Sequence, residues 1–267
     1  MNNQRENRVV SILIRTIFLF SIGGTLFAQK NDLSVSLNGE TFQKVYDASH
    51  GIILSFKRET PSGSLVGRLN YTNRFQTSGI QPEFEWYPVI AKGTYCYVNY
   101  GYSASSLFPR HRVGAEVFQG LPLSLEASFG IRYLLFASAN EIKLYTSSLG
   151  YYVGNFYVVV RGSLMLDADG AGRSLQFLLR KYFSDPDEFA FLRVGGGLSP
   201  DQQSVQSALG PKVYALASQS ASIGWQSGFQ RAVPIDVQLT WSNQELLFAP
   251  GDFVQSYALL IGYRYCF

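Results

Sequence analysis

The carboxyl-terminal stretch Tyr257-Ala-Leu-Leu-Ile-Gly-Tyr-Arg-Tyr-Cys-Phe267 decides the fold class of this chain. Every second residue counted back from Tyr265 is apolar or aromatic, whereas the alternate positions include Arg264 and Gly262. Successive side chains of a strand point to opposite faces, so this period of two gives the strand one apolar face. Aromatic residues gather toward its end, where a spanning strand would leave the bilayer. The stretch therefore predicts a β-strand with one lipid-facing side.

The ending also resembles the final strand of bacterial outer-membrane β-barrels, in which a terminal aromatic residue serves as the assembly signal. On that resemblance, Phe267, Tyr265 and Tyr263 form the predicted signal, and the barrel-assembly machinery is an expected partner. The expected location is the bacterial outer membrane, with lipid against the outer face of the spanning strands.

The amino-terminal residues have the features of a secretory signal peptide. Three arginines lie among the first fifteen residues, and residues 16–27 form an apolar segment. Cleavage between Ala28 and Gln29 would make residues 1–28 the signal peptide and residues 29–267 a single barrel domain. An uncleaved anchor is the alternative, although the apolar segment is shorter than the roughly 20 residues of a spanning helix.

The composition favours a membrane barrel over several other classes of protein. Aromatic residues make up 15% of the chain and charged residues only 15%, whereas a typical soluble domain has about 25% charged residues. The mean hydropathy is +0.03, as expected where strands alternate apolar and polar residues. A net charge of +3 gives no basic surface for nucleic acid. We expect Cys96 and Cys266 to lie on distant strands, so neither a disulfide nor a metal site is predicted.

Segments of alternating polarity, separated by turn residues, recur along the chain and predict an all-β, transmembrane, antiparallel up-and-down barrel. There are about fourteen such segments, or twelve if the first hairpin lies outside the wall, and both counts are even as in bacterial barrels. The predicted strands cover residues 33–41, 51–59, 64–74, 79–87, 93–103, 111–119, 122–135, 141–151, 155–166, 172–182, 188–197, 218–228, 233–242 and 255–267.

The connections between these strands alternate in length. Compact turn sequences such as Thr60-Pro-Ser-Gly63 and Val153-Gly-Asn155 join even-numbered strands to the next strand. Connections that are among the longest, over 104–110, 198–217 and 244–253, fall at the opposite end. Short periplasmic turns and longer outer loops are typical of outer-membrane barrels. A soluble sandwich would share the period of two, but it would explain neither the terminal phenylalanine nor the many aromatic strand ends.

A series of motifs rich in aromatic residues and glycine occupies the middle of the chain. The motifs are Asn99-Tyr-Gly-Tyr-Ser103, Leu107-Phe-Pro109, Arg112-Val-Gly-Ala-Glu116, Glu126-Ala-Ser-Phe-Gly-Ile-Arg-Tyr133 and Leu144-Tyr-Thr-Ser-Ser-Leu-Gly-Tyr-Tyr152. As a series, they resemble the YaiO family of outer-membrane β-barrel proteins. The resemblance covers most of the mature chain and is densest over residues 63–165. It implies an outer-membrane barrel without a cofactor or established catalytic residues, associated with surface polysaccharide handling.

The polar faces of the predicted strands would gather many charged side chains inside the barrel. On the lipid face, an Arg or Lys would cost roughly 2–4 kcal/mol. Two interpretations stay open: a polar passage or binding lumen for an anionic or sugar ligand, or an ion-pair network that plugs a small barrel. The residues expected to line the interior are Arg68, Glu85, Arg112, Glu116, Glu126, Arg132 and Arg161. The same faces carry Arg74, Glu83, Arg180, Arg193 and Asp236.

An outer-membrane hydrolase is the competing class of function. Glu116 and Glu126 are predicted on neighbouring strands, and two carboxylates about 5–9 Å apart can hydrolyse glycosidic bonds. A cross-strand Glu–Arg network is the simpler interpretation. A lipid or peptide hydrolase would need a histidine base. Of the two histidines, His50 and His111, the second is close in sequence to Ser105 but has no evident orienting acid.

A barrel that docks an envelope partner is the third possibility, with the long connection over 198–217 as its candidate surface. Weighed together, the observations favour a non-enzymatic barrel that serves as a narrow passage or binding site for saccharide. Its expected partners are outer-membrane lipid, the assembly machinery and a saccharide ligand.

Overall fold

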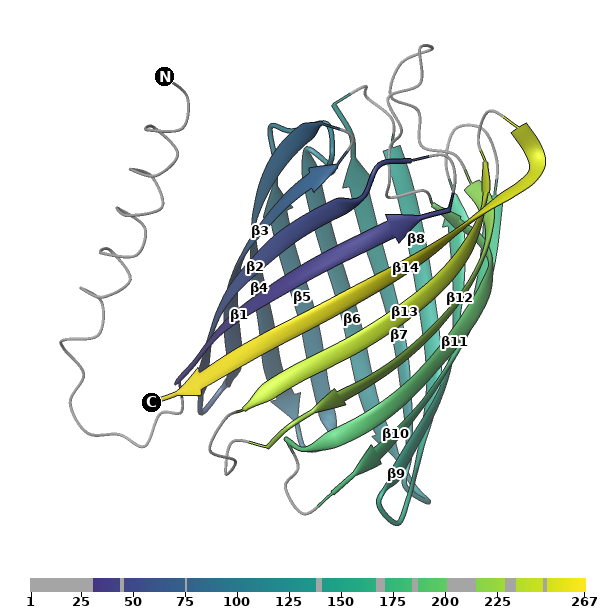
Figure 1. The fold of residues 1–267 in the computed structure, drawn as a ribbon. Coiled ribbons are helices and arrows are strands. Elements are labelled where there is room, and N and C mark those ends of the chain that lie inside the picture. Colours follow the sequence, from purple (N-terminus) through teal and green to yellow (C-terminus); the bar gives the residue numbers. More distant parts are fainter. Residues whose placement is uncertain are drawn as a thin grey trace.

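The described part of the chain forms one closed barrel of fourteen antiparallel strands. Its strands run obliquely around the barrel (Figure 1). The computed structural model describes residues 31–43, 46–74, 76–137, 141–166, 171–183, 187–200, 215–228, 234–246 and 249–267. The predicted signal peptide lies outside these residues. Within them, no helix is long and apolar enough to cross a membrane.

Consecutive strands pair with one another around the whole wall. The strands are β1 (Asn31–Phe42), β2 (Ser49–Thr60), β3 (Gly63–Arg74), β4 (Thr77–Ala91), β5 (Thr94–Tyr102), β6 (His111–Leu121), β7 (Leu125–Leu135), β8 (Glu141–Val153), β9 (Phe156–Leu166), β10 (Ala171–Tyr182), β11 (Phe189–Pro200), β12 (Ala215–Gln226), β13 (Ile235–Leu246) and β14 (Ala249–Cys266).

The barrel closes where the first strand meets the last, which lie side by side in purple and yellow in Figure 1. The register of β1 against β14 begins at Asp32↔Cys266. Beyond it, the backbones of Asn31 and Phe267 exchange hydrogen bonds of 2.9 and 3.0 Å. Closure leaves no strand edge with unpaired backbone N–H and C=O groups. A sheet in lipid needs this, because no water is present there to hydrogen-bond such groups. The fourteen-strand prediction is confirmed, and the twelve-strand alternative is wrong because β1 and β2 are part of the wall.

The outer face of the barrel is apolar, on the parity that the sequence predicted. Burial alternates residue by residue along β4 and β14, so one face of each strand looks outward and the other into the barrel. A continuous exposed apolar surface of this kind suits lipid rather than water. From Tyr257 onward, the exposed residues of β14 are Tyr257, Leu259, Ile261, Tyr263 and Tyr265.

Short turns connect the strands at one end of the barrel, where β1 begins and β14 ends. We name this end the turn end and the opposite end the loop end. Residues 61–62 join β2 to β3, and residues 154–155 join β8 to β9, as predicted. The strand predicted over 122–135 begins only at Leu125, because Leu123 and Ser124 have positive φ angles of 62° and 60° and form the turn.

Two predicted long connections are shorter than expected. The connection over 244–253 is mostly strand, because β13 continues to Leu246 and β14 begins at Ala249 with a register shift near Glu245. In the other, β11 continues to Pro200 and β12 begins at Ala215. The glutamine-rich middle of that connection, proposed as a docking surface, lies outside the described residues.

The interior changes character along the barrel axis. Near the loop end of β7–β9, Leu134, Phe136, Ile142 and Met165 pack into a small apolar core and are between 0 and 4% exposed. Further toward the turn end, the inner faces of the same strands carry charged, hydroxyl and aromatic side chains. No disulfide joins the two cysteines. The polar interior of the turn-end half is thus the part of the barrel that could bind a ligand.

Candidate functional site

The alternation of β4 explains how charged side chains reach the interior. Ile80, Phe84 and Trp86 point outward and are at least 40% exposed, whereas Glu83 and Glu85 between them point inward and are 7% and 4% exposed. The same parity rule puts all seven predicted lumen residues on the inner face. The structure divides them among separate networks rather than gathering them in one cluster.

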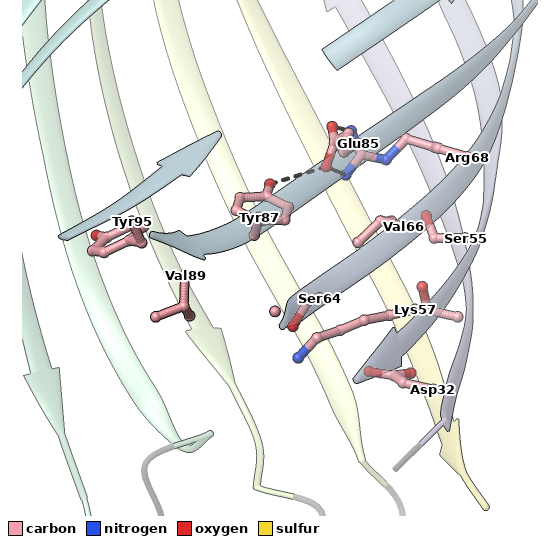
Figure 2. A pocket seen from close by; sticks show the side chains of 12 residues that line it. Asp32, Ser55, Lys57, Ser64, Val66, Arg68, Glu85, Tyr87, Val89 and Tyr95 are labelled. Carbon is pink, nitrogen blue, oxygen red and sulfur yellow. Dashed lines mark hydrogen bonds and ion pairs between the residues drawn. The ribbon is translucent and has the colours of Figure 1, made fainter. Parts of the chain in front are cut away.

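The first network joins β3, β4 and β6. Arg68 Nη1 lies 2.8 Å from Glu85 Oε1 and 3.5 Å from Glu83 Oε2, and Arg112 Nη1 lies 3.2 Å from Glu83 Oε1. Register explains part of this arrangement, because Arg68 is the direct cross-strand partner of Glu83. The Tyr87 hydroxyl donates to Glu85 Oε2 at 3.0 Å, as Figure 2 shows. Both carboxylates are therefore fully engaged.

A cavity of about 530 Å³ lies beside this network, toward the turn end. We name it the balanced cavity, because the charged residues that line it are two acids and two bases. They are Asp32, Lys57, Arg68 and Glu85 (Figure 2).

The second network connects strands that are not neighbours. Glu116 on β6 accepts hydrogen bonds from Arg161 Nη2 at 2.8 Å and Nη1 at 3.2 Å, and from the Ser128 hydroxyl at 2.6 Å. The partner of Glu116 on β7 is Gly130. A Cβ added at Gly130 would lie 2.8 Å from the Glu116 side chain. Gly130 therefore leaves the space in which the carboxylate reaches over β7 toward β9.

Glu126 belongs to a third network, built from tyrosines. It accepts hydrogen bonds from Tyr157 at 2.6 Å and Tyr95 at 3.2 Å. In the sheet it pairs with Gly120, four residues from Glu116, which at the rise of an antiparallel strand separates the two backbones by roughly 14 Å. The two acids therefore have separate partners. The two acids lie on neighbouring strands, as predicted, but strand register sets their backbones well apart, which disfavours the alternative of a carboxylate pair.

The turn-end half of the interior also contains stacked aromatic rings. Tyr95 stacks on Phe118 with ring centroids 4.6 Å apart, and Tyr152 stacks on Tyr157 at 4.1 Å. Sequence reasoning missed these four residues as site candidates, because only charged side chains were considered as lumen residues. The signal was available: Tyr157 shares its parity with Arg161, so the rule that puts one inside also puts the other inside.

The second cavity, of about 580 Å³, is lined by four arginines and one glutamate. We name it the arginine cavity. Five aromatic residues and several hydroxyl groups complete its wall. The charged residues are Arg132, Arg161, Arg180, Arg193 and Glu126; the aromatic residues are Tyr95, Phe118, Tyr152, Tyr157 and Tyr182.

Two further ion pairs lie outside these cavities. Arg264 Nε lies 3.1 Å from Asp236 Oδ1 at the turn end, and Arg74 Nη2 lies 3.7 Å from Glu40 Oε2 nearer the loop end. Both pairs join strands next to each other or nearly so and brace the wall near the closure of the barrel. Glu40 and Arg264 had not been predicted as lumen residues, although both share the inward parity of their strands.

The groups considered for hydrolysis are not arranged as a catalytic site. Nδ1 of His111 lies 3.1 Å from the Tyr100 hydroxyl, and Tyr100 faces outward. The Ser105 hydroxyl donates to the backbone carbonyl of Ser78 at 3.4 Å. Among the described residues, no group of three or more His, Cys, Asp or Glu side chains is placed to hold a metal ion. The geometry thus favours ligand binding in the lumen over chemistry at the loops.

Comparison with known proteins gives a family and a fold. The YaiO membrane beta barrel domain model matches residues 30–202, and no curated protein sequence matches the chain. The structure is similar to that of a bacterial polysaccharide outer membrane secretin, with a TM-score of 0.57, 7% identity, and 89% of this chain and 98% of that chain covered. It is also similar to OprD of Pseudomonas aeruginosa, with a TM-score of 0.50, 8% identity, and 92% and 97% covered. At these identities the likeness concerns the barrel fold alone.

Proposed function

Because the chain belongs to the YaiO membrane β-barrel family and spans the outer membrane as a closed barrel of fourteen strands, we propose that it binds saccharides in its lumen and gives them a narrow passage. In this proposal the protein is not an enzyme, and it serves the handling of surface polysaccharide. A polysaccharide secretin shares the fold.

The observation that carries the proposal is the combination of ring faces and hydroxyl groups in the arginine cavity. A sugar ring presents C–H groups on its faces and hydroxyl groups around its edge. Stacked tyrosines offer flat apolar surface for the faces, and the hydroxyls of Thr146, Ser148 and Ser163 offer donors and acceptors for the edge.

The two cavities also suit an extended ligand. Each has a volume in the range of roughly 300–1,000 Å³ that binding sites usually have. Tyr95 lines both of them. An oligosaccharide could therefore lie across Tyr95 with units in both cavities. An interior filled only by ion pairs, the alternative interpretation, would have no use for exposed ring faces in this position.

Single-channel conductance of the refolded protein in a planar bilayer tests the proposal. We expect a stable conductance that a neutral hexasaccharide interrupts with resolvable blocks. Replacing Tyr152 by alanine should shorten these blocks by roughly three- to tenfold, since one aromatic contact is worth about 0.5–1.5 kcal/mol. Tyr151→Ala is the matched control, because Tyr151 is the next residue along β8 and faces outward.

The outcomes separate the two parts of the proposal. A bilayer that stays silent although folded barrel is present would refute the passage and indicate a plugged lumen. Binding of the sugar would then be measured by calorimetry on the refolded protein in detergent. If the sugar neither blocks the conductance nor binds in calorimetry, the saccharide function is wrong.

A further inference from the structure

The two cavities differ in how their positive charges are neutralised. In the balanced cavity and its network, Arg68 and Arg112 each lie within 3.2 Å of a buried carboxylate. In the arginine cavity, only Arg161 has such a partner, which is Glu116. Within the described part of the chain, no ion pair is found for the remaining three arginines of the arginine cavity, Arg132, Arg180 and Arg193.

These three arginines rest on aromatic rings. The Arg180 guanidinium lies 4.3 Å from the centroid of Phe189, Arg193 lies 5.3 Å from Phe191, and Arg132 lies 5.9 Å from Tyr97. A ring stabilises a guanidinium through its face and leaves the in-plane N–H donors available. Nε of Arg180 and Nε of Arg193 are buried and have no hydrogen-bond partner in the described structure. Arg180 Nη1 donates one hydrogen bond, to the Tyr182 hydroxyl at 3.1 Å. The rings thus orient the cations and leave most of their donors unsatisfied.

The arginines also repel one another. The charges of Arg180 and Arg161 act on Arg193, and those of Arg112 and Arg161 act on Arg132, where the charge of Glu116 opposes them in part. Like charges held close together at a partly dry site cost free energy unless a counter-charge is present. Glu126 lines the cavity and supplies one negative charge, but among the described residues no ion pair joins it to any of the three arginines. An anion entering this cavity would therefore both satisfy the free donors and relieve the repulsion.

We infer that the saccharides taken by this lumen are acidic, and that Arg132, Arg180 and Arg193 hold the carboxylate groups of their uronate units. This inference rests on the proposed function. A guanidinium binds a carboxylate with two parallel hydrogen bonds, in the plane that a stacked ring leaves open. Arginines on β7, β10 and β11 can engage successive acidic units, while the tyrosines contact the sugar rings between them.

Calorimetry with a hexagalacturonate and with its fully methyl-esterified form tests the inference. The two ligands share the same sugar chain and differ only in whether the carboxyl groups are charged. We expect the refolded protein in detergent to bind the acid at least tenfold more tightly than the ester, as one charge-assisted hydrogen bond would provide. The preference should shrink as salt is added. Inorganic phosphate at the same concentration should compete only weakly.

Arginine variants test which residues cause the preference for the acid over the ester. Arg193→Gln and Arg132→Gln should each lower affinity for the acid by roughly tenfold and leave affinity for the ester unchanged. Retained ester binding also demonstrates that each variant is folded. Arg173→Gln is the control, because Arg173 is an exposed arginine on the outward parity of β10 and its loss changes the net charge equally. It should leave both affinities unchanged.

Other outcomes would overturn the inference in distinguishable ways. Equal affinity for acid and ester would refute acidic specificity and leave saccharide binding intact. Strong competition by phosphate would mean that the arginines hold small anions rather than acidic sugars. Failure of both ligands to bind would refute the proposed function together with the inference.

Discussion

The Glu116–Arg161 pair allows a quantitative test of how the barrel is held together. Glu116→Gln keeps the shape of the side chain and removes its charge. The carboxylate is 4% exposed and the guanidinium 26% exposed, so the variant leaves a cation that water reaches only in part. Breaking a fully buried pair costs about 3–5 kcal/mol. Because Arg161 keeps some contact with water, we expect a loss of about 2–3 kcal/mol in the free energy of unfolding.

Arg161→Gln, the reciprocal variant, should lower the free energy of unfolding by at least as much. It leaves the almost completely buried carboxylate of Glu116 without its guanidinium partner, and among the described residues the Ser128 hydroxyl remains as its strong hydrogen-bond donor. In the double variant neither group is charged, so the losses should not add. A double-mutant cycle should give a coupling free energy of about 1–3 kcal/mol.

Urea unfolding of the refolded barrel in lipid vesicles, followed by tryptophan fluorescence, measures these differences. Glu59→Gln is the matched control. It breaks an ion pair of nearly the same length, the 2.7 Å contact between Lys57 and Glu59, whose side chains are 37% and 42% exposed. That loss should be below about 1 kcal/mol. If the Glu116 and Glu59 variants lose the same free energy of unfolding, burial does not strengthen the pair and the reasoning is wrong. The same holds if the losses of the Glu116 and Arg161 variants add within about 0.5 kcal/mol in the double variant.

Three further predictions concern packing, the lipid face and the free arginines. Gly130→Ala should lower the free energy of unfolding by about 1–3 kcal/mol, because the added Cβ would meet the side chain of Glu116 at 2.8 Å. Gly162→Ala is the control and should be neutral, because nothing lies within 4 Å of a Cβ added there. The midpoints of urea unfolding compare the two variants. Leu239→Arg, on the outer face of β13, should lower the free energy of unfolding by about 2–4 kcal/mol. Gln238→Arg, on the inner face of the same strand, should lower it much less. The folded fraction of each variant after refolding into vesicles measures the difference. Glu116→Gln should tighten hexagalacturonate binding severalfold, because it releases a fourth arginine in the arginine cavity; calorimetry that shows no gain would contradict this.

Strand positions were largely predictable, and the failures have local causes. The alternation in the final strand and the Gly and Pro turns are short-range signals, so the inward parity of Glu85, Arg132 and Arg161 followed from sequence. The start of β7 was misplaced because Leu123 and Ser124 adopt positive φ, which neither residue type predicts. The connection over 244–253 was misread because a register shift near its start has no sequence signature.

The sequence by itself determined the barrel, its inner and outer faces and the charges inside, because these depend on a period of two and on turn chemistry. The structure decided between fourteen and twelve strands, because it shows that β1 and β2 belong to the wall. Only the tertiary structure decided which charges are neutralised and which stay available. Glu116 meets Arg161 although they are 45 residues apart and on strands that do not pair. Such a contact depends on the registers of every intervening strand and on the curvature of the closed wall. Among the described residues, the same geometry leaves Arg180 and Arg193 without carboxylate partners, and so makes one side of the lumen a candidate anion site.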